Sequence, residues 1–122
     1  MTNLAMDYTP YIQKLKERKA QEKTLAENKR QQALIAAREI AALLKRNFAA
    51  QRVILFGSTL SPERFHLRSD IDVAALGVPA KTFFKAYACA LDLAKPFNLD
   101  LIDLNACRPT LSAKIESAGM EL

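Results

Sequence analysis

The sequence of 122 residues lacks any apolar run of about eighteen residues, the length that a helix needs to span a membrane. Residues 1–7 also lack the basic and then apolar pattern of a secretory signal. Membrane contact and secretion are therefore not indicated, and we expect a cytoplasmic protein.

Cysteine and histidine, which most often bind zinc, are scarce. The two cysteines, Cys89 and Cys107, lie in apolar or neutral surroundings without the spacing of metal ligands. We expect reduced thiols rather than a disulfide or a zinc site. The single histidine, His66, lies between Arg64 and Arg68, and we interpret it as a solvated loop residue rather than a catalytic one.

Glycine is also rare, since the chain has three and none precedes Gly57. From residue 9 to residue 50 the only proline is Pro10, and Ala, Lys, Glu, Gln and Leu dominate. These residues favour the helix, so the composition predicts one long helix over 9–50. Thr9 is its expected N-cap and Pro10 its first helical residue.

The two halves of this predicted helix differ in their apolar residues. Between residues 14 and 32 the apolar residues are too few for one packed face, so we expect that part to project or to lie against another chain. The second half has the helical spacing of a face that covers a sheet. We therefore expect a helical arm, 1–33, and a domain, 34–122. The apolar face of the second half comprises Leu34, Ala37, Ile40, Ala41, Leu44 and Phe48.

Charge is distributed unevenly along the chain. Residues 1–50 hold ten Lys and Arg against five Asp and Glu, whereas residues 51–122 hold eight of each kind. The whole formal net charge of +5 therefore belongs to the N-terminal helical part. This excess favours contact with an acidic surface. A protein partner or a second copy of the chain is favoured over nucleic acid, because aromatic residues are not interleaved with the basic ones.

The remaining pattern predicts a small mixed α/β sheet covered by helices. Strands are expected at 52–56, 70–76 and 98–104, and a short helix or turn at 60–65. Helices are expected at 81–95, closed by Pro96, and at 110–118, capped by Gly119. The predicted buried face of the helix at 81–95 comprises Phe83, Phe84, Tyr87, Leu91 and Ala94.

The strongest functional pattern follows the first predicted strand. Gly57 and Ser58 form a turn whose N–H groups and hydroxyl suit a polyphosphate. The next strand opens with Asp70 and Asp72, which alternation places on one face, about 6.5 Å apart. Carboxylates so placed repel each other unless a cation lies between them, and Mg²⁺ is the usual cation where phosphates are handled.

A third carboxylate is expected from the strand at 98–104. Asp100 and Asp103 lie three residues apart, so they point to opposite faces and only one of them can join Asp70 and Asp72. Periodicity alone does not say which. The guanidinium groups of Arg64 and Arg68 suit phosphate oxygens, although a charged surface loop is the simpler interpretation of both.

Taken together, a Gly-Ser pair, a spacer, an Asp-x-Asp and a later carboxylate resemble the nucleotidyltransferase superfamily. The similarity is greatest to its minimal members, the MNT proteins that are paired with HEPN-domain partners. It covers roughly residues 34–122, including residues 111–115 and 119–122, which are similar to the family's last helix and strand. The spacer here is one residue longer than the commonest form. In this pattern the third carboxylate corresponds to Asp100, and Asp103 is structural.

The resemblance implies a nucleotidyltransferase fold with a long N-terminal helical extension, and an enzyme that uses ATP and two Mg²⁺ ions. Asp70, Asp72 and Asp100 would be catalytic and would bind the metal, with Asp100 helping to orient the proton of the attacking hydroxyl. Gly57, Ser58, Arg68 and Ser69 would bind the nucleotide.

The function that the resemblance implies is that of an antitoxin, which transfers AMP to a tyrosine of a HEPN-type RNase toxin. One alternative is transfer to a small-molecule hydroxyl of the aminoglycoside kind, although such enzymes usually carry a further domain. Another is a non-catalytic antitoxin subunit that binds its partner through the basic arm. The N-terminal helix would mediate any homo- or hetero-oligomer.

Overall fold

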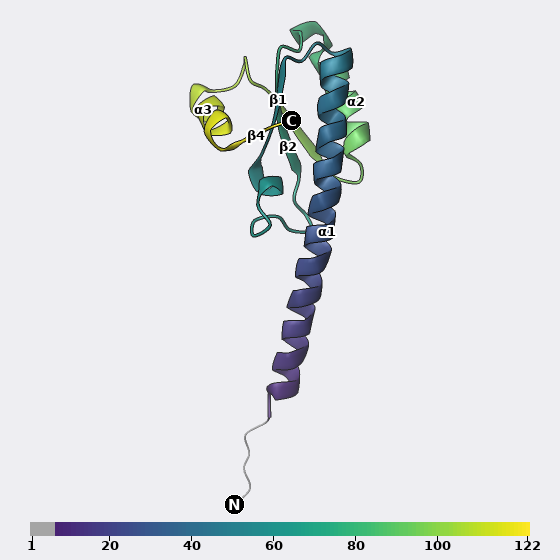
Figure 1. Cartoon of the computed structure of the whole chain (residues 1–122), viewed down its shortest axis with the longest axis vertical. Helices are drawn as coiled ribbons and strands as arrows, with labels where there is room; N and C mark the ends of the chain where they lie inside the picture. The colour runs from purple at the N-terminus through teal and green to yellow at the C-terminus, as the bar shows by residue number, and fades with distance from the viewer. Residues whose placement is uncertain (1–6) are drawn as a thin grey trace, which may run out of the picture.

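A four-stranded mixed sheet forms the centre of the fold in the computed structural model, which describes residues 7–122 (Figure 1). The strand order is β3-β2-β1-β4, in which β1 pairs antiparallel with both neighbours and β2 pairs parallel with β3. The expected mixed sheet is thus confirmed, and each of the three predicted strands lies within one residue of its expected bounds. The strands are β1 Arg52–Phe56, β2 Ile71–Leu76, β3 Leu99–Asp103 and β4 Met120–Glu121.

The long N-terminal helix is confirmed as α1, Thr9–Asn47, which ends three residues before the predicted residue 50. The prediction of Thr9 as N-cap was wrong, because the cap is Tyr8 and makes no side-chain hydrogen bond. Asp7 takes over part of the capping role, since its Oδ1 accepts a hydrogen bond from the N–H of Thr9 over 2.9 Å. The helix therefore begins one residue earlier than the sequence pattern indicated.

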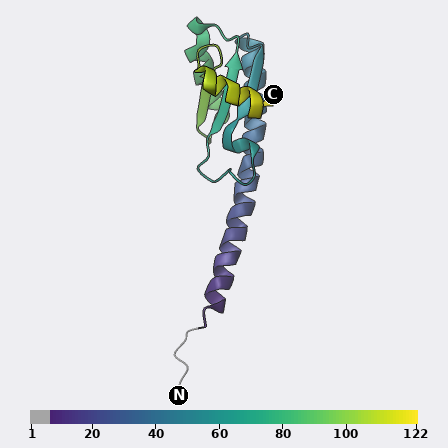
Figure 2. The ribbon, with the colours of Figure 1, turned by 90° about the vertical axis from the view of Figure 1, so that its left-hand side faces the viewer.

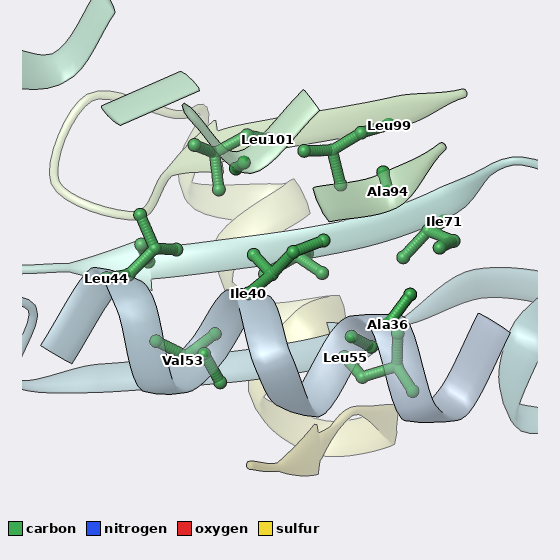
Figure 3. Close-up of a cluster of buried hydrophobic side chains, with 14 of the residues drawn as sticks. Ala36, Ile40, Leu44, Val53, Leu55, Ile71, Ala94, Leu99 and Leu101 are labelled. Carbon is green, nitrogen blue, oxygen red and sulfur yellow. The ribbon is translucent and has the colours of Figure 1, made fainter. Parts of the chain in front are cut away.

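The second half of α1 packs on one face of the sheet, beside α2, Ala80–Ala94. Figure 3 shows Ile40 and Leu44 of α1 in one buried cluster with Val53 and Leu55 of β1, which confirms the predicted apolar face. Each of these four side chains is fully buried, and burying one such side chain stabilises a fold by about 1.5–3 kcal/mol. The buried residues of α1 are Ala33, Ala36, Ala37, Ile40, Ala41 and Leu44.

The predicted buried face of α2 was wrong in two places. Phe84 is 85% exposed and Leu91 is 40% exposed, although both were expected in the core. Alanines instead face the core, and Tyr87 packs at its edge with its hydroxyl donating a hydrogen bond to the carbonyl of Leu99 over 2.9 Å. The sequence pattern was misleading because Phe84 and Leu91 lie on α2 next to the alanines that face the core. Their large apolar side chains suggested a buried position, whereas the smaller alanines are the residues that are buried. The buried residues of α2 are Ala86, Ala90 and Ala94.

The third helix, α3, Pro109–Ala118, covers the opposite face of the sheet from α1 and α2 (Figures 1 and 2). Ile115 of α3 is buried there against Ile54 of β1. Gly119 allows this close approach, because a β-carbon at that position would lie 2.4 Å from Cγ2 of Ile54. Arg52 then links the C-terminal elements to β1, since its guanidinium pairs with Glu116 over 2.7 Å and also with Glu121.

The first half of α1 projects beyond the sheet (Figures 1 and 2). Its side chains remain exposed until Leu25, and burial begins at Ala26. Because α1 continues without a break through residues 33 and 34, the boundary between arm and domain remains a prediction. Among residues 7–122, none of the helices combines the length and the apolar character that crossing a bilayer requires. The exposed apolar side chains at and near the free end of α1 are Tyr8, Tyr11, Ile12 and Leu15.

Candidate active site

Strand β1 runs directly into a 3₁₀ helix, η1, Gly57–Leu60. Of the short helix or turn expected at 60–65, the turn is confirmed at residues 62–64, where the N–H of Phe65 donates to the carbonyl of Ser61 over 3.0 Å, while the short helix η1 lies earlier, directly after β1. Gly57 has φ +80°, a conformation that favours glycine, and this reverses the chain at the end of the strand. Ser58 is half-buried at the second position of η1, and its carbonyl accepts a hydrogen bond from the N–H of Ser61 over 3.0 Å.

The backbone at Gly57 lies directly against the carboxylate of Asp72. A β-carbon at Gly57 would be only 2.3 Å from Oδ2 of Asp72 and 3.2 Å from its Cγ. Any other residue at position 57 would collide with this carboxylate. Gly57 of the turn and the candidate metal ligand Asp72 are thus in contact, although fifteen positions separate them in the sequence.

The sheet register places Asp72 between Phe56 and Asp100. Phe56 is its partner across the antiparallel pair, and Asp100 is its partner across the parallel pair. Partners in register share a face, so Asp72 and Asp100 lie on the same face as Phe56. Asp70 immediately precedes β2 and is exposed.

Asp103 lies in a different environment from Asp100. Periodicity alone does not say which of the two residues lies beside Asp72. Asp103 is the register partner of Ala75, on the other face from Asp100. Its Oδ1 accepts a hydrogen bond from the N–H of Asn105 over 3.0 Å, which fixes the turn after β3. The register therefore brings Asp100, and not Asp103, beside Asp72.

Among the three candidate metal ligands, Asp72 has a clearly shifted pKa. Burial, together with the negative charges of Asp100 and Asp70, raises the pKa of Asp72 from 3.8 to about 6. A carboxylate with this environment gains from a nearby cation, so the three side chains fit a divalent metal chemically. Within residues 7–122, however, no three His, Cys, Asp or Glu side chains converge closely enough to form a preassembled site.

Two predicted nucleotide ligands, Arg68 and Ser69, lie in the loop between η1 and β2 and make contacts of their own there. Ser69 is buried, and its hydroxyl accepts a hydrogen bond from the N–H of His66 over 2.9 Å. The N–H of Arg68 donates to Nδ1 of His66 over 3.1 Å, while the Arg68 side chain lines a cavity beside Lys19 and Lys23 of α1. Ser69 thus closes the loop and Arg68 faces the arm, so nucleotide binding by either remains a prediction.

One contact at the site was missed by sequence reasoning. Arg30 of α1 donates a hydrogen bond from Nη1 to the carbonyl oxygen of Thr59, in the middle of η1, over 3.1 Å. Its guanidinium is held from the other side by Glu27, over 2.8 Å and 2.9 Å. Thr59 is fully buried, and its hydroxyl donates to the carbonyl of Asp70 over 3.4 Å. These bonds connect α1, the turn and the start of β2.

A second cavity, distinct from the one beside the arm, opens next to Gly57. It lies between the β1–η1 segment and α3, and Arg64 and Lys114 contribute to its wall. The sequence indicates Arg64 as a group suited to phosphate oxygens, whereas no sequence pattern indicates Lys114. The other lining residues are Phe56, Leu60, Leu111, Ile115 and Ala118.

A family model described as "Polymerase beta, Nucleotidyltransferase" matches residues 38–122, which include the turn and all three carboxylates. The chain belongs to this nucleotidyltransferase family. The predicted family is therefore confirmed for the domain, while residues 1–37 lie outside the match. None of the curated proteins matches the chain.

Solved structures with the same nucleotidyltransferase fold come from toxin–antitoxin complexes. A structure described as a toxin–antitoxin with AMP-PNP is 27% identical, with a TM-score of 0.58, over 70% of this chain and 70% of that chain. The MntA–HepT toxin–antitoxin is 23% identical, with a TM-score of 0.54, over 72% and 69%. A tri-AMPylated Shewanella oneidensis HEPN toxin in complex with MNT antitoxin is 24% identical, with a TM-score of 0.55, over 73% and 70%.

Proposed function

We propose that this nucleotidyltransferase transfers AMP from ATP to a tyrosine hydroxyl of a HEPN-type toxin and so acts as its antitoxin in the cytoplasm. The observation that carries the proposal is the contact of Gly57 with Asp72, which is itself the register partner of Asp100. A phosphate-binding turn against a pair of carboxylates is what nucleotidyl transfer requires. The AMP-PNP in one similar structure and the AMPylated toxin in another support the choice of nucleotide and acceptor.

Asp70, Asp72 and Asp100 would hold Mg²⁺ in this proposal. When bound, Mg²⁺ would neutralise the carboxylates and stabilise the negative charge that develops on the phosphates. The pKa of Asp72 is raised first by burial and then by the negative charges of Asp100 and Asp70, and a bound cation would offset both effects, which supports this role.

The groups of the chain would divide the rest of the chemistry between them. The N–H groups at the start of η1 and the hydroxyl of Ser58 would hold the phosphates. The tyrosine oxygen would attack the α-phosphorus, the bond from that phosphorus to the bridging oxygen would break, and pyrophosphate would leave. Asp100 would accept or orient the proton of the attacking hydroxyl.

The projecting half of α1 is the proposed docking surface for the toxin. It presents exposed apolar side chains at its end, among them Tyr11 and Leu15, within the part of the chain that carries the excess of positive charge. Such a surface suits a partner with an acidic and partly apolar face.

The test is transfer of labelled AMP from ATP, with Mg²⁺ present, to a purified HEPN-type toxin. The double variant Asp70→Asn and Asp72→Asn should abolish transfer. Asp103→Asn is the matched control, because it changes the same kind of residue on the other face of the sheet. Undiminished transfer by the double variant would contradict the proposal. Suppression of the toxin by the double variant would instead indicate inhibition by contact alone.

A further inference from the structure

A cavity of about 730 Å³ opens where the projecting half of α1 leaves the sheet. One wall is α1, over residues 19–26, and the other is the loop over residues 65–68, which lies beside this part of the helix (Figures 1 and 2). We call this cavity the arm groove. Its helical wall lies outside the residues that match the nucleotidyltransferase family, so the groove depends on the N-terminal extension of this chain.

Part of the lining of the arm groove is apolar. Leu67 is 43% exposed, whereas the ring of Phe65 is buried. Ala20 and Ala26 are the small residues of the helical wall, so a side chain from outside can approach α1 closely there. Because apolar surface is stabilised when it is removed from water, Leu67 and the two alanines suit an apolar side chain of a partner.

Three cations line the arm groove, and they come from both walls. Lys19 and Lys23 lie four residues apart on α1, which places them on one face of the helix, and Arg68 lies on the loop. All three are exposed, and none takes part in a salt bridge among the described residues 7–122. Against them the lining holds the carboxylate of Glu22, so positive charge is in excess and complements an acidic partner.

Hydrogen bonds fix the loop wall of the arm groove. The hydroxyl of Ser69 accepts a hydrogen bond from the N–H of His66 over 2.9 Å, and the N–H of Ser69 donates to the carbonyl of His66 over 3.0 Å. The N–H of Arg68 also donates to Nδ1 of His66 over 3.1 Å. Since these bonds hold Leu67 and Arg68 in place, a partner that binds there needs little ordering of the backbone.

The arm groove lies close to the candidate active site. Arg68 precedes Asp70 by two residues, so their α-carbons are at most about 7 Å apart. The hydroxyl of Thr59 in η1 donates to the carbonyl of Asp70, which connects this end of the loop to the turn after β1. A partner that contacts Arg68 would therefore have its surface beside the proposed metal ligands.

We propose that the arm groove docks an acidic segment of the protein partner, whose carboxylates pair with Lys19, Lys23 and Arg68 and whose apolar side chain covers Leu67. The inference rests on the proposed function and specifies where the toxin binds. A protein is favoured over nucleic acid because Leu67 is exposed, whereas the ring of Phe65 is buried and cannot stack on a base. A second copy of the chain is disfavoured, since its N-terminal half carries the same excess of positive charge.

The first experiment measures binding of a purified HEPN-type toxin to the full chain by calorimetry, at low and at physiological ionic strength. The double variant Lys19→Glu and Lys23→Glu should weaken binding at least tenfold at low ionic strength, and by less when salt screens the charges. The matched control is Lys81→Glu with Lys85→Glu, because these lysines have the same spacing, are exposed and lie on α2, away from the groove. The control should bind within twofold of the wild type.

A second pair of variants tests the apolar contact. Leu67→Ser should weaken toxin binding by about tenfold at both ionic strengths, because the lost contact is not electrostatic. Phe84→Ser is the control, since Phe84 is an exposed apolar residue on α2 and does not line the arm groove. Thermal unfolding of each variant verifies that it is folded.

The possible results separate this inference from the proposed function. If the lysine variant and Leu67→Ser bind the toxin as tightly as their controls while the wild type transfers AMP, the inference alone is wrong. If both variants weaken binding but the wild type transfers no AMP, the proposed transfer is wrong and the arm groove is still the docking site. If the wild type does not bind the toxin at all, the inference is wrong.

Other occupants of the arm groove would give different results. If the lysine variant abolishes self-association of the chain, measured by sedimentation, and leaves toxin binding unchanged, the occupant is a second copy. If it weakens binding of single-stranded RNA and not of the toxin, the occupant is nucleic acid. Either result would overturn the inference.

Discussion

Arg30 and Thr59 are joined by a hydrogen bond of 3.1 Å from the guanidinium to the carbonyl oxygen, although they lie 29 residues apart in the sequence. The side chain of Arg30 is only 13% exposed, and Glu27 fixes it from one turn away on the same helix. The long helix therefore supports the turn that lies against Asp72. A substitution of Arg30 should therefore affect the candidate active site.

Replacing Arg30 with alanine should loosen η1. Loss of a hydrogen bond from a charged donor near the surface should lower the free energy of unfolding by about 1 kcal/mol. ATP binding should weaken as well, because the turn loses its support. Urea unfolding and ATP titration measure the two effects. Arg18→Ala, in the exposed part of α1, is the control, and equal behaviour of the two variants would show that the bond to Thr59 has no influence.

Truncation of α1 at two points should separate docking from support. Deleting residues 1–24 removes the projecting half but keeps Glu27 and Arg30, so the domain should fold and bind ATP with Mg²⁺ normally. Deleting residues 1–32 also removes Arg30 and should lower stability and weaken nucleotide binding. Both truncations should bind the partner weakly, as measured by calorimetry. If the variant that lacks residues 1–24 modifies the partner at the full rate, the arm is not the docking surface.

Gly57 and Gly77 provide a matched pair for testing the contact with Asp72. Both have positive φ, +80° and +100°, so alanine at either position should cost about 1–2 kcal/mol of stability. Only at Gly57 would the new β-carbon collide with Asp72, whereas at Gly77 the nearest atom is Cγ of Gln51 at 3.0 Å. Gly57→Ala should therefore lose AMP transfer, and Gly77→Ala should retain it. Equal retention of transfer would mean that the contact is not needed.

The stability of the chain should depend on pH through Asp72. Because its pKa is raised from 3.8 to about 6, the folded state binds a proton more tightly than the unfolded state, and stability falls as the pH rises from about 4 to 6. The Asp72→Asn variant has no carboxyl group to ionise at this position. It should match the wild type near pH 4 and exceed it by about 1 kcal/mol at pH 7.5, after allowance for solvent screening of a half-exposed group.

Thermal unfolding at the two pH values measures the difference between the variant and the wild type. An unchanged difference across this range would contradict the expected environment of Asp72. Addition of Mg²⁺ at pH 7.5 should stabilise the wild type more than the variant, because the variant lacks one of the proposed ligands.

Local rules predicted the three longer strands and the three α-helices of the fold, and the shared face of Asp70 and Asp72 remains a prediction because Asp70 precedes β2. Alternation along a strand depends only on neighbouring residues, so the pattern was informative without any knowledge of pairing. The choice between Asp100 and Asp103 required the register of β3 on β2, which periodicity does not contain. The outward position of Phe84 similarly depends on how α2 packs against α1, since alanines fit a close contact between two helices.

The parts of the candidate site that escaped prediction are contacts between distant segments. The bond from Arg30 to Thr59 forms because α1 crosses η1, and the position of Lys114 beside the cavity follows from the packing of α3 on β1. Strand β4 has two residues, Met120 and Glu121, and is too short to show any alternation. In each case the information lies in the three-dimensional packing of distant segments, which local sequence rules do not contain.

The projecting helix limits which acceptors the enzyme could reach. At about 1.5 Å per residue, the fully exposed part of α1, residues 9–25, extends about 26 Å. A rigid helix would hold a bound toxin at one distance and in one orientation, whereas a flexible linker would allow it many. A toxin bound to the helix would present a single patch of its surface to the carboxylates. The tyrosine to be modified would then be selected by its position relative to the carboxylates. The enzyme would not need to recognise the residues around that tyrosine.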